Sequence, residues 1–491
     1  MRLFVSTRKK ENAVYSKEAI IQGLAKDGGL YTPIGLNDIK IDLKKCLSLN
    51  YQKLATYILS DIFDDFTEEE IKTVVSDAYT DSFKTDDIVL ATEIGKDFLL
   101  ELYHGPTSAF KDVALTILPH LLATAYQTSA DNKKIYILTA TSGDTGKAAL
   151  EAFKDVTNTY ITVFYPKDGV SEIQKRQMIT TKGNNVDVVS VAGNFDDCQR
   201  LVKTIYEDKE IQENYKNVQL SSANSINIGR LIPQVVYYFK AYSDLVKNEV
   251  IKLHDKVNFI VPTGNFGNIL AGYIAKLIGC PINKLVCASN KNNVLVDFIN
   301  TGIYDINRKF YTTMSPSMDI LVSSNLERLL FILSDYDDEK IKQYMDDLYV
   351  KGRYETDKEI LNKLQQSFVG IDVKESECQK AISKAFYENN RLIDPHTAIA
   401  YHAADIYRDN CKNIILATAS PFKFADSVYG SIVEKAAESE AAAMKRLAKM
   451  SKEEIPADLK NLDRLEILHN RTINIDEGRD YVIERIKKLN D

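Results

Sequence analysis

The chain has 491 residues, with 62 lysines and arginines against 69 aspartates and glutamates, and a formal net charge of -7. Both signs are scattered along the sequence, which argues against a nucleic-acid partner or an anionic membrane surface. The N-terminus lacks the apolar region of a signal peptide, and no run approaches the ~18 apolar residues of a membrane span, so we expect a cytoplasmic protein.

Residues 1 to 95 are expected to form a mostly helical N-terminal domain. Helical patterns occur in SKEAIIQGLA and YQKLATYILSDIF, and DGGLYTP lies between them as a turn. A length of 491 residues suggests two to four domains.

From about residue 97, short β-branched runs alternate with helical patterns. The predicted strands are 97–103, 134–140, 160–165, 186–192, 217–222, 257–262, 284–289 and 413–419. Helices are predicted over 109–125, in GDTGKAALEAF and around DDCQRLVKTIY. This alternation predicts an α/β region, 96–432, with mainly parallel sheet covered by helices, whose ligands bind beyond the carboxyl ends of the strands. Residues 433–491, rich in Ala, Glu and Lys, are expected to be a helical C-terminal segment.

Cysteine and histidine spacing favours no metal site. The six cysteines include no CxxC pair, and the six histidines lack HExxH spacing, so we expect reduced thiols. His396 and His402 would lie on different helical faces, and we interpret both as ordinary polar residues.

The segment HGPTSAFKD places Lys111 in the first turn of a predicted helix, after a Gly-Pro-Thr turn. The positive end of the helix dipole and the neighbouring Phe110 both disfavour the ammonium form. A neutral lysine can condense with an aldehyde such as pyridoxal phosphate. Taken alone, however, a lysine is more often a solvated surface charge.

Three further strand-to-helix loops are candidate anion sites. TATSGDTGKAA is not a Walker A loop, because only two residues separate Gly143 from Gly146 and Ala148 replaces the magnesium-binding hydroxyl; a carboxylate or phosphate nest fits better. VPTGNFGNILAG is not GxGxxG, and its glycines and asparagines suit a phosphate. In SSANSINIGR, Asn224, Ser225 and Arg230 could bind a second phosphate.

Together these segments resemble the bacterial and fungal threonine synthases, which are fold type II pyridoxal-phosphate enzymes related in architecture to the β subunit of tryptophan synthase. The resemblance covers most of the chain, including STRKKENAVYSKEAIIQGLAKDGGLYTP, HGPTSAFKD, TSGDTGKAA, NSINIGR, GNFGN, LIDPHTAIA and ATASPFKFADSV. HGPTSAFKD followed by GNFGN is highly specific, whereas TSGDTG is shared more loosely on this fold.

The resemblance implies a set of site residues. Lys111 would form the Schiff base with pyridoxal 5'-phosphate, and Thr418 would meet the pyridine nitrogen. The cofactor phosphate would be held by Gly264, Asn265, Phe266, Gly267 and Asn268. The substrate carboxylate would be held by Ser142, Gly143, Asp144, Thr145 and Gly146. The substrate phosphate would be held by Asn224, Ser225 and Arg230.

Two departures from the family pattern bear on the site. Ile228 stands where many members have tryptophan, and Ser420-Pro421-Phe422-Lys423-Phe424 replaces His-Pro-Ala-Lys-Phe. The second departure leaves the residue that meets the pyridine nitrogen open between Thr418 and Ser420.

The implied activity is that of a lyase: elimination of phosphate from O-phospho-L-homoserine, followed by addition of water to give L-threonine. The implied protein works as a monomer or homodimer. Two alternatives stay open, namely a phospho-lyase that releases 2-oxobutyrate and a catalytically inactive ligand-binding homologue.

Overall fold

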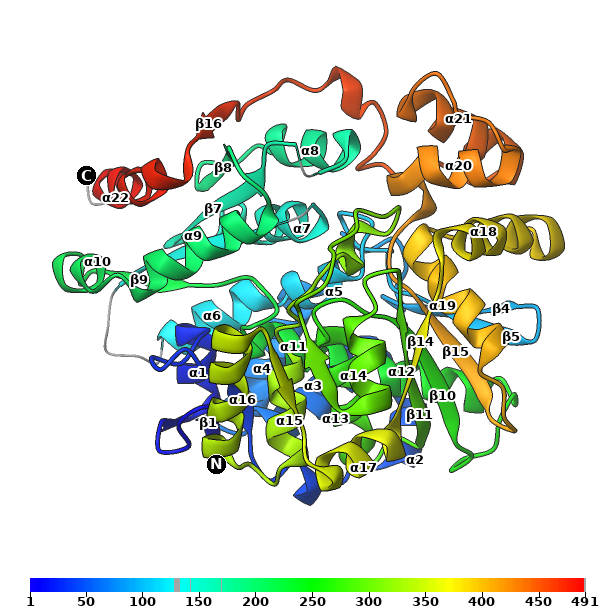
Figure 1. Ribbon diagram of the computed structural model, residues 1–491, viewed down its shortest axis with the longest axis horizontal. Coiled ribbons are helices and arrows are strands. Elements are labelled where there is room, and N and C mark those ends of the chain that lie inside the picture. Colours follow the sequence, from blue (N-terminus) through cyan, green and yellow to red (C-terminus); the bar gives the residue numbers. More distant parts are fainter. Residues whose placement is uncertain (128–132, 142, 169, 490–491) are drawn as a thin grey trace.

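The computed structural model describes residues 1–127, 133–141, 143–168 and 170–489. Within these ranges two sheets, each flanked by helices, form two lobes that face one another (Figure 1). The long, buried β-branched runs of the sequence supply their strands, as is typical of parallel sheets covered on both faces. All eight strands predicted from residue 97 onward are confirmed, with bounds that differ by two residues or fewer at each end.

The larger sheet has the order β14-β11-β10-β15-β5-β4 in the described chain. Neighbours in it are parallel except β4 and β5, which form an antiparallel hairpin. Its strands are β4 (Leu90–Ile94), β5 (Asp97–Glu101), β10 (Val257–Pro262), β11 (Ile282–Ser289), β14 (Phe368–Asp372) and β15 (Lys412–Ala417). Helices that pack around it include α12 (Val235–Lys247), α13 (Gly267–Leu277), α14 (Val294–Thr301), α17 (Lys358–Ser367), α18 (Glu375–Asn389) and α19 (Pro395–Ile406). The carboxyl ends of β10, β15 and β5 lie side by side, so the loops that follow them meet.

The smaller sheet has the order β16-β8-β7-β6-β9, and all its described pairings are parallel. Its strands are β6 (Lys134–Ala140), β7 (Thr159–Pro166), β8 (Val186–Val191), β9 (Val218–Ser221) and β16 (Arg471–Ile473). Its helices are α7 (Asp144–Phe153), α8 (Glu172–Ile179), α9 (Phe195–Glu207) and α10 (Lys209–Asn214). Helix α7 begins near the larger lobe, which places Asp144 beside Lys111.

The predicted helix over 109–125 is in fact two helices, α5 (Lys111–Leu115) and α6 (Leu118–Gln127). Pro119 lies in the first turn of α6, where its missing N–H costs nothing, but it could not donate to the carbonyl of Leu115 in a continuous helix. Lys111 therefore begins a helix of only five residues. Two further short helices are α11 (Ile228–Leu231) and η4 (Pro421–Phe424).

The N-terminal region contains helices α1 (Ser16–Gln22), α2 (Leu43–Ser48), α3 (Tyr51–Ile62) and α4 (Glu68–Ala78). It also contains an antiparallel sheet that the helical prediction missed, formed by β1 (Phe4–Ser6), β2 (Ala13–Val14) and β3 (Tyr31–Pro33). The predicted turn DGGLYTP therefore ends in a strand. Strands of two or three residues are too short to show the alternation by which strands are recognised.

Between β11 and β14 the chain adds α15 (Leu326–Leu333), α16 (Asp338–Lys351) and a short hairpin of β12 (Ile303–Asp305) and β13 (Arg353–Glu355). The loop before α15 carries Ser317, which reaches the cavity described below.

The C-terminal segment crosses from the larger lobe to the smaller one along one side of the molecule (Figure 1). Helices α20 (Ala425–Val433) and α21 (Glu440–Ser451) pack beside α18, whereas α22 (Gly478–Lys488) buries Val482 and Ile486 in the core of the smaller lobe. The purely helical expectation was incomplete, because β16 extends the smaller sheet by pairing with β8. No helix in the described ranges is long and apolar enough to cross a membrane.

Candidate active site

A cavity of about 100 Å³ opens where the loops after β5, β6, β9, β10 and β15 converge. The sequence-predicted residues that line it are Lys111, Thr145, Asn224, Ser225, Arg230, Gly264, Asn265, Phe266, Gly267, Asn268 and Thr418. These residues come from both lobes and from segments separated by more than 300 positions in sequence. The fold thus brings together parts of all four predicted loops.

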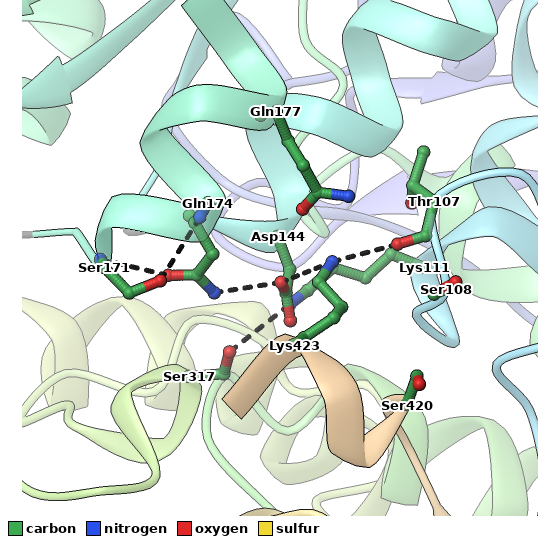
Figure 2. A network of polar contacts seen from close by, with 12 residues as sticks. Thr107, Ser108, Lys111, Asp144, Ser171, Gln174, Gln177, Ser317, Ser420 and Lys423 are labelled. Carbon is green, nitrogen blue, oxygen red and sulfur yellow. Dashed lines mark hydrogen bonds and ion pairs between the residues drawn. The ribbon is translucent and has the colours of Figure 1, made fainter. Parts of the chain in front are cut away.

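Lys111 is buried, and its Nζ donates a hydrogen bond to Oγ of Ser317 at 3.5 Å. Nζ also lies 3.6 Å from Oδ2 of Asp144 and 5.4 Å from the centroid of the Phe110 ring (Figure 2). Burial lowers the pKa of Lys111 to about 8, with Asp144 acting in the opposite direction and Arg230 and Lys423 adding to the decrease. The neutral amine needed for covalent chemistry is thus accessible near neutral pH.

The GNFGN loop turns tightly between β10 and α13. Phe266 adopts the left-handed conformation, with φ 60° and ψ 7°, and its buried ring packs on Phe368. Oδ1 of Asn268 accepts hydrogen bonds from the hydroxyls of Tyr237 and Tyr238, which leaves its Nδ2 as a buried donor with no protein partner among the described residues. That unsatisfied donor lies in the first turn of α13, where helix amides favour an anion.

We expect Gly264→Ala to weaken cofactor binding at least tenfold. A Cβ at Gly264 would lie 2.4 Å from the backbone oxygen of Ser317, so the two loops would have to separate, at a cost of ~1 to 3 kcal/mol. Gly430→Ala is the matched control, because its Cβ would meet nothing within 4 Å. Spectrophotometric titration with pyridoxal phosphate measures the effect, and equal affinities in both variants would contradict it.

Arg230 is a buried guanidinium in the short helix α11. Its Nη1 donates to the carbonyl of Ala223 at 2.8 Å, and within the described chain it makes no ion pair with a carboxylate. Burial lowers its pKa to about 10, so it remains charged at neutral pH. A buried cation that lines a cavity without a counter-ion is a site for an anionic ligand.

The adjacent loop is held in place by Arg328, which is fully buried. Its guanidinium donates to the carbonyls of Tyr31, Ser225 and Ile226 and to Oδ1 of Asn325. Ile228, which stands where many threonine synthases have tryptophan, is buried in the core rather than lining this cavity. The substitution thus leaves Asn224, Ser225 and Arg230 in place.

In the TSGDTG loop, several groups expected to bind an anion are already bound to other protein groups. Oγ1 of Thr141 accepts hydrogen bonds from the amides of Gly143 and Gly146, both at 2.9 Å. The Asp144 carboxylate accepts from Lys423 and from Gln174, so it is an acceptor rather than a donor toward a substrate carboxylate. Thr145 is the loop residue that lines the cavity, and Ser142 lies outside the described residues.

Of the two hydroxyls left open for the pyridine nitrogen, Thr418 lines the cavity. Ser420 instead caps η4, where its Oγ accepts a hydrogen bond from the amide of Phe422 at 3.4 Å. The geometry therefore favours Thr418.

His396 and Ser317 also line the cavity, although the sequence interpretation assigned neither to the site. The interpretation of His396 as an ordinary polar residue did not anticipate its position at the cavity. Its Nδ1 lies 2.7 Å from Oδ1 of Asp394, and its Nε2 accepts a hydrogen bond from the amide of Ser317 at 3.2 Å. The sequence LIDPHTAIA indicates Asp394 as a helix N-cap, but it does not indicate that the neighbouring His396 faces the cavity.

A second cavity of about 460 Å³ adjoins the first through Asn224, Ser225 and Asn265. It is lined by the N-terminal region, α9, α16 and the 322–324 loop. In the described residues we find no cluster of three or more His, Cys, Asp or Glu side chains that could hold a metal ion.

Parallel sheets in two lobes, a buried lysine of lowered pKa and a glycine-asparagine turn at a helix N-terminus define a fold type II pyridoxal-phosphate dependent enzyme. The family model for pyridoxal-phosphate dependent enzymes matches residues 89–419. The model for the threonine synthase N terminus matches residues 3–79, and that for the threonine synthase C-terminal region matches residues 397–471.

The chain belongs to the threonine synthase family. It is 36% identical over 465 residues to threonine synthase of Saccharomyces cerevisiae, with 88% of this chain and 89% of the relative covered. It is 39% identical over 450 residues to threonine synthase-like 1 of Homo sapiens, which covers 87% of this chain, and the chain spans 60% of the length of that relative. The crystal structure of pyridoxal-phosphate-bound threonine synthase from Brucella melitensis has a TM-score of 0.86 at 33% identity and 99% coverage of both chains.

Proposed function

We propose that this chain is a threonine synthase that converts O-phospho-L-homoserine and water to L-threonine and phosphate in the cytoplasm. The observation that carries the proposal is the placement of Lys111 in one cavity with two separate sites for anions. One is the first turn of α13 with the unsatisfied amide of Asn268, and the other is Arg230 without a carboxylate partner. A phosphorylated cofactor and a phosphorylated substrate together require two such sites.

The residues present fit pyridoxal phosphate. The buried donor of Asn268 and the close approach at Gly264 suit its phosphate, and Thr418 offers a hydroxyl to its ring nitrogen. The amine of Lys111, with its lowered pKa, suits its aldehyde. The chemistry that the cofactor supplies when bound is delocalisation of the negative charge that develops at the substrate α carbon.

The chain's own groups account for the remaining tasks. Nζ of Lys111 takes the proton from the α carbon and returns one there at the end. Arg230, Asn224 and Ser225 bind the γ-phosphate of the substrate and stabilise it as it leaves, because a buried guanidinium pairs strongly with a dianion. Thr145, at the start of α7, orients the substrate carboxylate.

A three-part division of the chain supports the same function. We propose an N-terminal domain over 1–95, a two-lobed catalytic region over 96–432 and a C-terminal segment over 433–491. The three family models follow this order, although the second and third overlap between residues 397 and 419.

The test is the absorption spectrum of the purified protein before and after addition of O-phospho-L-homoserine, with the product identified by chromatography. We expect cofactor absorption near the edge of the visible range, a spectral change on addition, and threonine with an equal amount of phosphate. Release of 2-oxobutyrate without threonine would assign the chain to the phospho-lyases instead. Absence of cofactor absorption would indicate an inactive homologue.

A further inference from the structure

The site contains a buried cluster of three charged side chains, of which the reaction described above uses only Lys111. Asp144, at the start of α7 in the smaller lobe, lies between Lys111 and Lys423, which both belong to the larger lobe. Nζ of Lys423 is 2.8 Å from Oδ1 of Asp144, whereas Nζ of Lys111 is 3.6 Å from Oδ2 (Figure 2). The carboxylate is therefore bound more closely by Lys423.

Lys423 has no other anionic partner in the described chain. Its side chain is 0% exposed, and its Nζ donates a second hydrogen bond to the carbonyl of Thr107 at 3.0 Å. Thr107 belongs to the same loop as Lys111, so Lys423 also fixes the loop that carries the reactive amine. Nε2 of Gln174, on α8, donates to Oδ1 of Asp144 at 2.9 Å and completes the coordination of that oxygen.

The Asp144 carboxylate remains ionised in this setting. Burial by itself would raise its pKa, but Lys423 and then Lys111 outweigh burial and hold the pKa well below its usual range. One negative charge thus faces two lysines. A buried carboxylate with a single lysine would form a tight pair, and that lysine would be held as an ammonium ion.

We propose that Lys423 is a positioning residue. It binds one oxygen of Asp144 and fixes Thr107. The amine of Lys111 therefore has no counter-ion of its own and can exchange protons with substrate. The inference deepens the proposed function and rests on it in one respect, namely that Lys111 is the reactive amine. Lys423 itself touches neither the cavity nor the substrate.

The other ionisable groups near Lys111 differ from Lys423 in what they bind. Arg230 on α11 is a second cation that disfavours the ammonium form. His396 on α19 lines the cavity, with Nε2 accepting from the Ser317 amide. The Asp112 carboxylate, next in the chain, accepts from the amide and hydroxyl of Thr107 at 2.8 and 2.5 Å. None of these groups binds the Asp144 carboxylate.

The test measures the protonation of Lys111 without turnover. The full-length chain, freed of cofactor, is treated with formaldehyde and cyanoborohydride over a range of pH, and methylation of Lys111 is read by mass spectrometry. Only the neutral amine reacts, so labelling rises with pH through a midpoint expected near 8 in the unmodified chain. In Lys423→Met the midpoint should rise by about one pH unit, because a like charge is lost and Asp144 can pair fully with Lys111.

Two further variants sharpen the result. Lys423→Arg keeps the charge and should restore the midpoint, and Asp144→Asn should move it in the opposite direction, to lower pH. Lys147→Met is the matched control: it also removes a lysine near the start of α7, but Nζ of Lys147 pairs with Glu151 at 2.9 Å instead. Its midpoint should stay at that of the unmodified chain.

The outcomes separate this inference from the proposed function. A midpoint in Lys423→Met that equals the control would overturn the inference even if threonine is formed. If Lys423→Met fails to fold, the direction of the shift in Asp144→Asn decides, and no shift or an upward shift counts against the inference. If the unmodified chain yields no threonine, the labelling result still stands, because it involves no substrate.

In the holoenzyme, the acid limb of the kcat profile should move to higher pH in Lys423→Met, with recovery in Lys423→Arg. A purely structural contribution of Lys423 would lower kcat at every pH and leave the position of the limb unchanged.

Discussion

Lys111→Ala is expected to abolish turnover and to remove the absorption of the bound cofactor near the visible edge. The reason is that, among the described residues that line the cavity, Lys111 is the one lysine, and it shares this cavity with the GNFGN turn that suits the cofactor phosphate. Absorption spectra and a threonine assay of the purified variant measure the effect. We expect a loss of at least about a thousandfold in kcat, roughly 4 kcal/mol of transition-state stabilisation.

Lys276→Ala is the control for this prediction. Burial also lowers the pKa of Lys276 to about 8, but its Nζ donates to the carbonyl of Asn283 and to Oγ of Ser367, away from the cavity. This variant should keep both the absorption and the activity. If Lys276→Ala lost the cofactor while Lys111→Ala kept it, the assignment of the reactive amine would be wrong.

Arg230→Ala should raise KM for O-phospho-L-homoserine tenfold to a hundredfold and leave the cofactor absorption intact. Deletion of one charge-assisted contact to phosphate costs about 1.5 to 3 kcal/mol, which corresponds to this range of affinity. Arg230→Lys should give an intermediate KM, because an ammonium keeps the charge but not the two-pronged geometry. Steady-state kinetics at fixed pH and salt concentration provide the measurement.

An independent measurement supports or contradicts the assignment of Arg230. Inorganic phosphate should raise the thermal midpoint of the unmodified holoenzyme, since a ligand that binds only the folded state stabilises it. The rise should be absent in Arg230→Ala. Loss of cofactor absorption in this variant would place Arg230 at the cofactor rather than at the substrate.

Much of the site was predictable because its signals are local. The strand bounds over 134–140 and 257–262 were predicted to the residue, since buried apolar runs bounded by turn residues indicate strands by themselves. The loops that follow such strands are where ligands of parallel sheets bind, so the sequence could indicate the loops of Lys111, GNFGN and Arg230 as candidate sites. That they come from two different sheets was seen only in the structure.

The missed strands are of two kinds. Strands β1, β2, β3, β12, β13 and β16 have two or three residues each, and pairing with distant strands rather than local preference stabilises them. Strands β4 and β14, of five residues each, were also not predicted. The break between α5 and α6 was missed because the apolar pattern continues through Pro119. The helix breaks there because Pro119 has no N–H to donate.

The sequence by itself determined the eight longer runs of the sheets that were predicted, the glycine- and asparagine-rich turns that follow them and which lysine follows the Gly-Pro-Thr turn, because each depends on the conformational preferences of a few neighbouring residues. Only the tertiary structure decided that Asp144 pairs with Lys423, that His396 faces the cavity and that Thr418 rather than Ser420 lines it. Such contacts join segments far apart in sequence, and their energies depend on burial and distance, which exist only once the two lobes have packed.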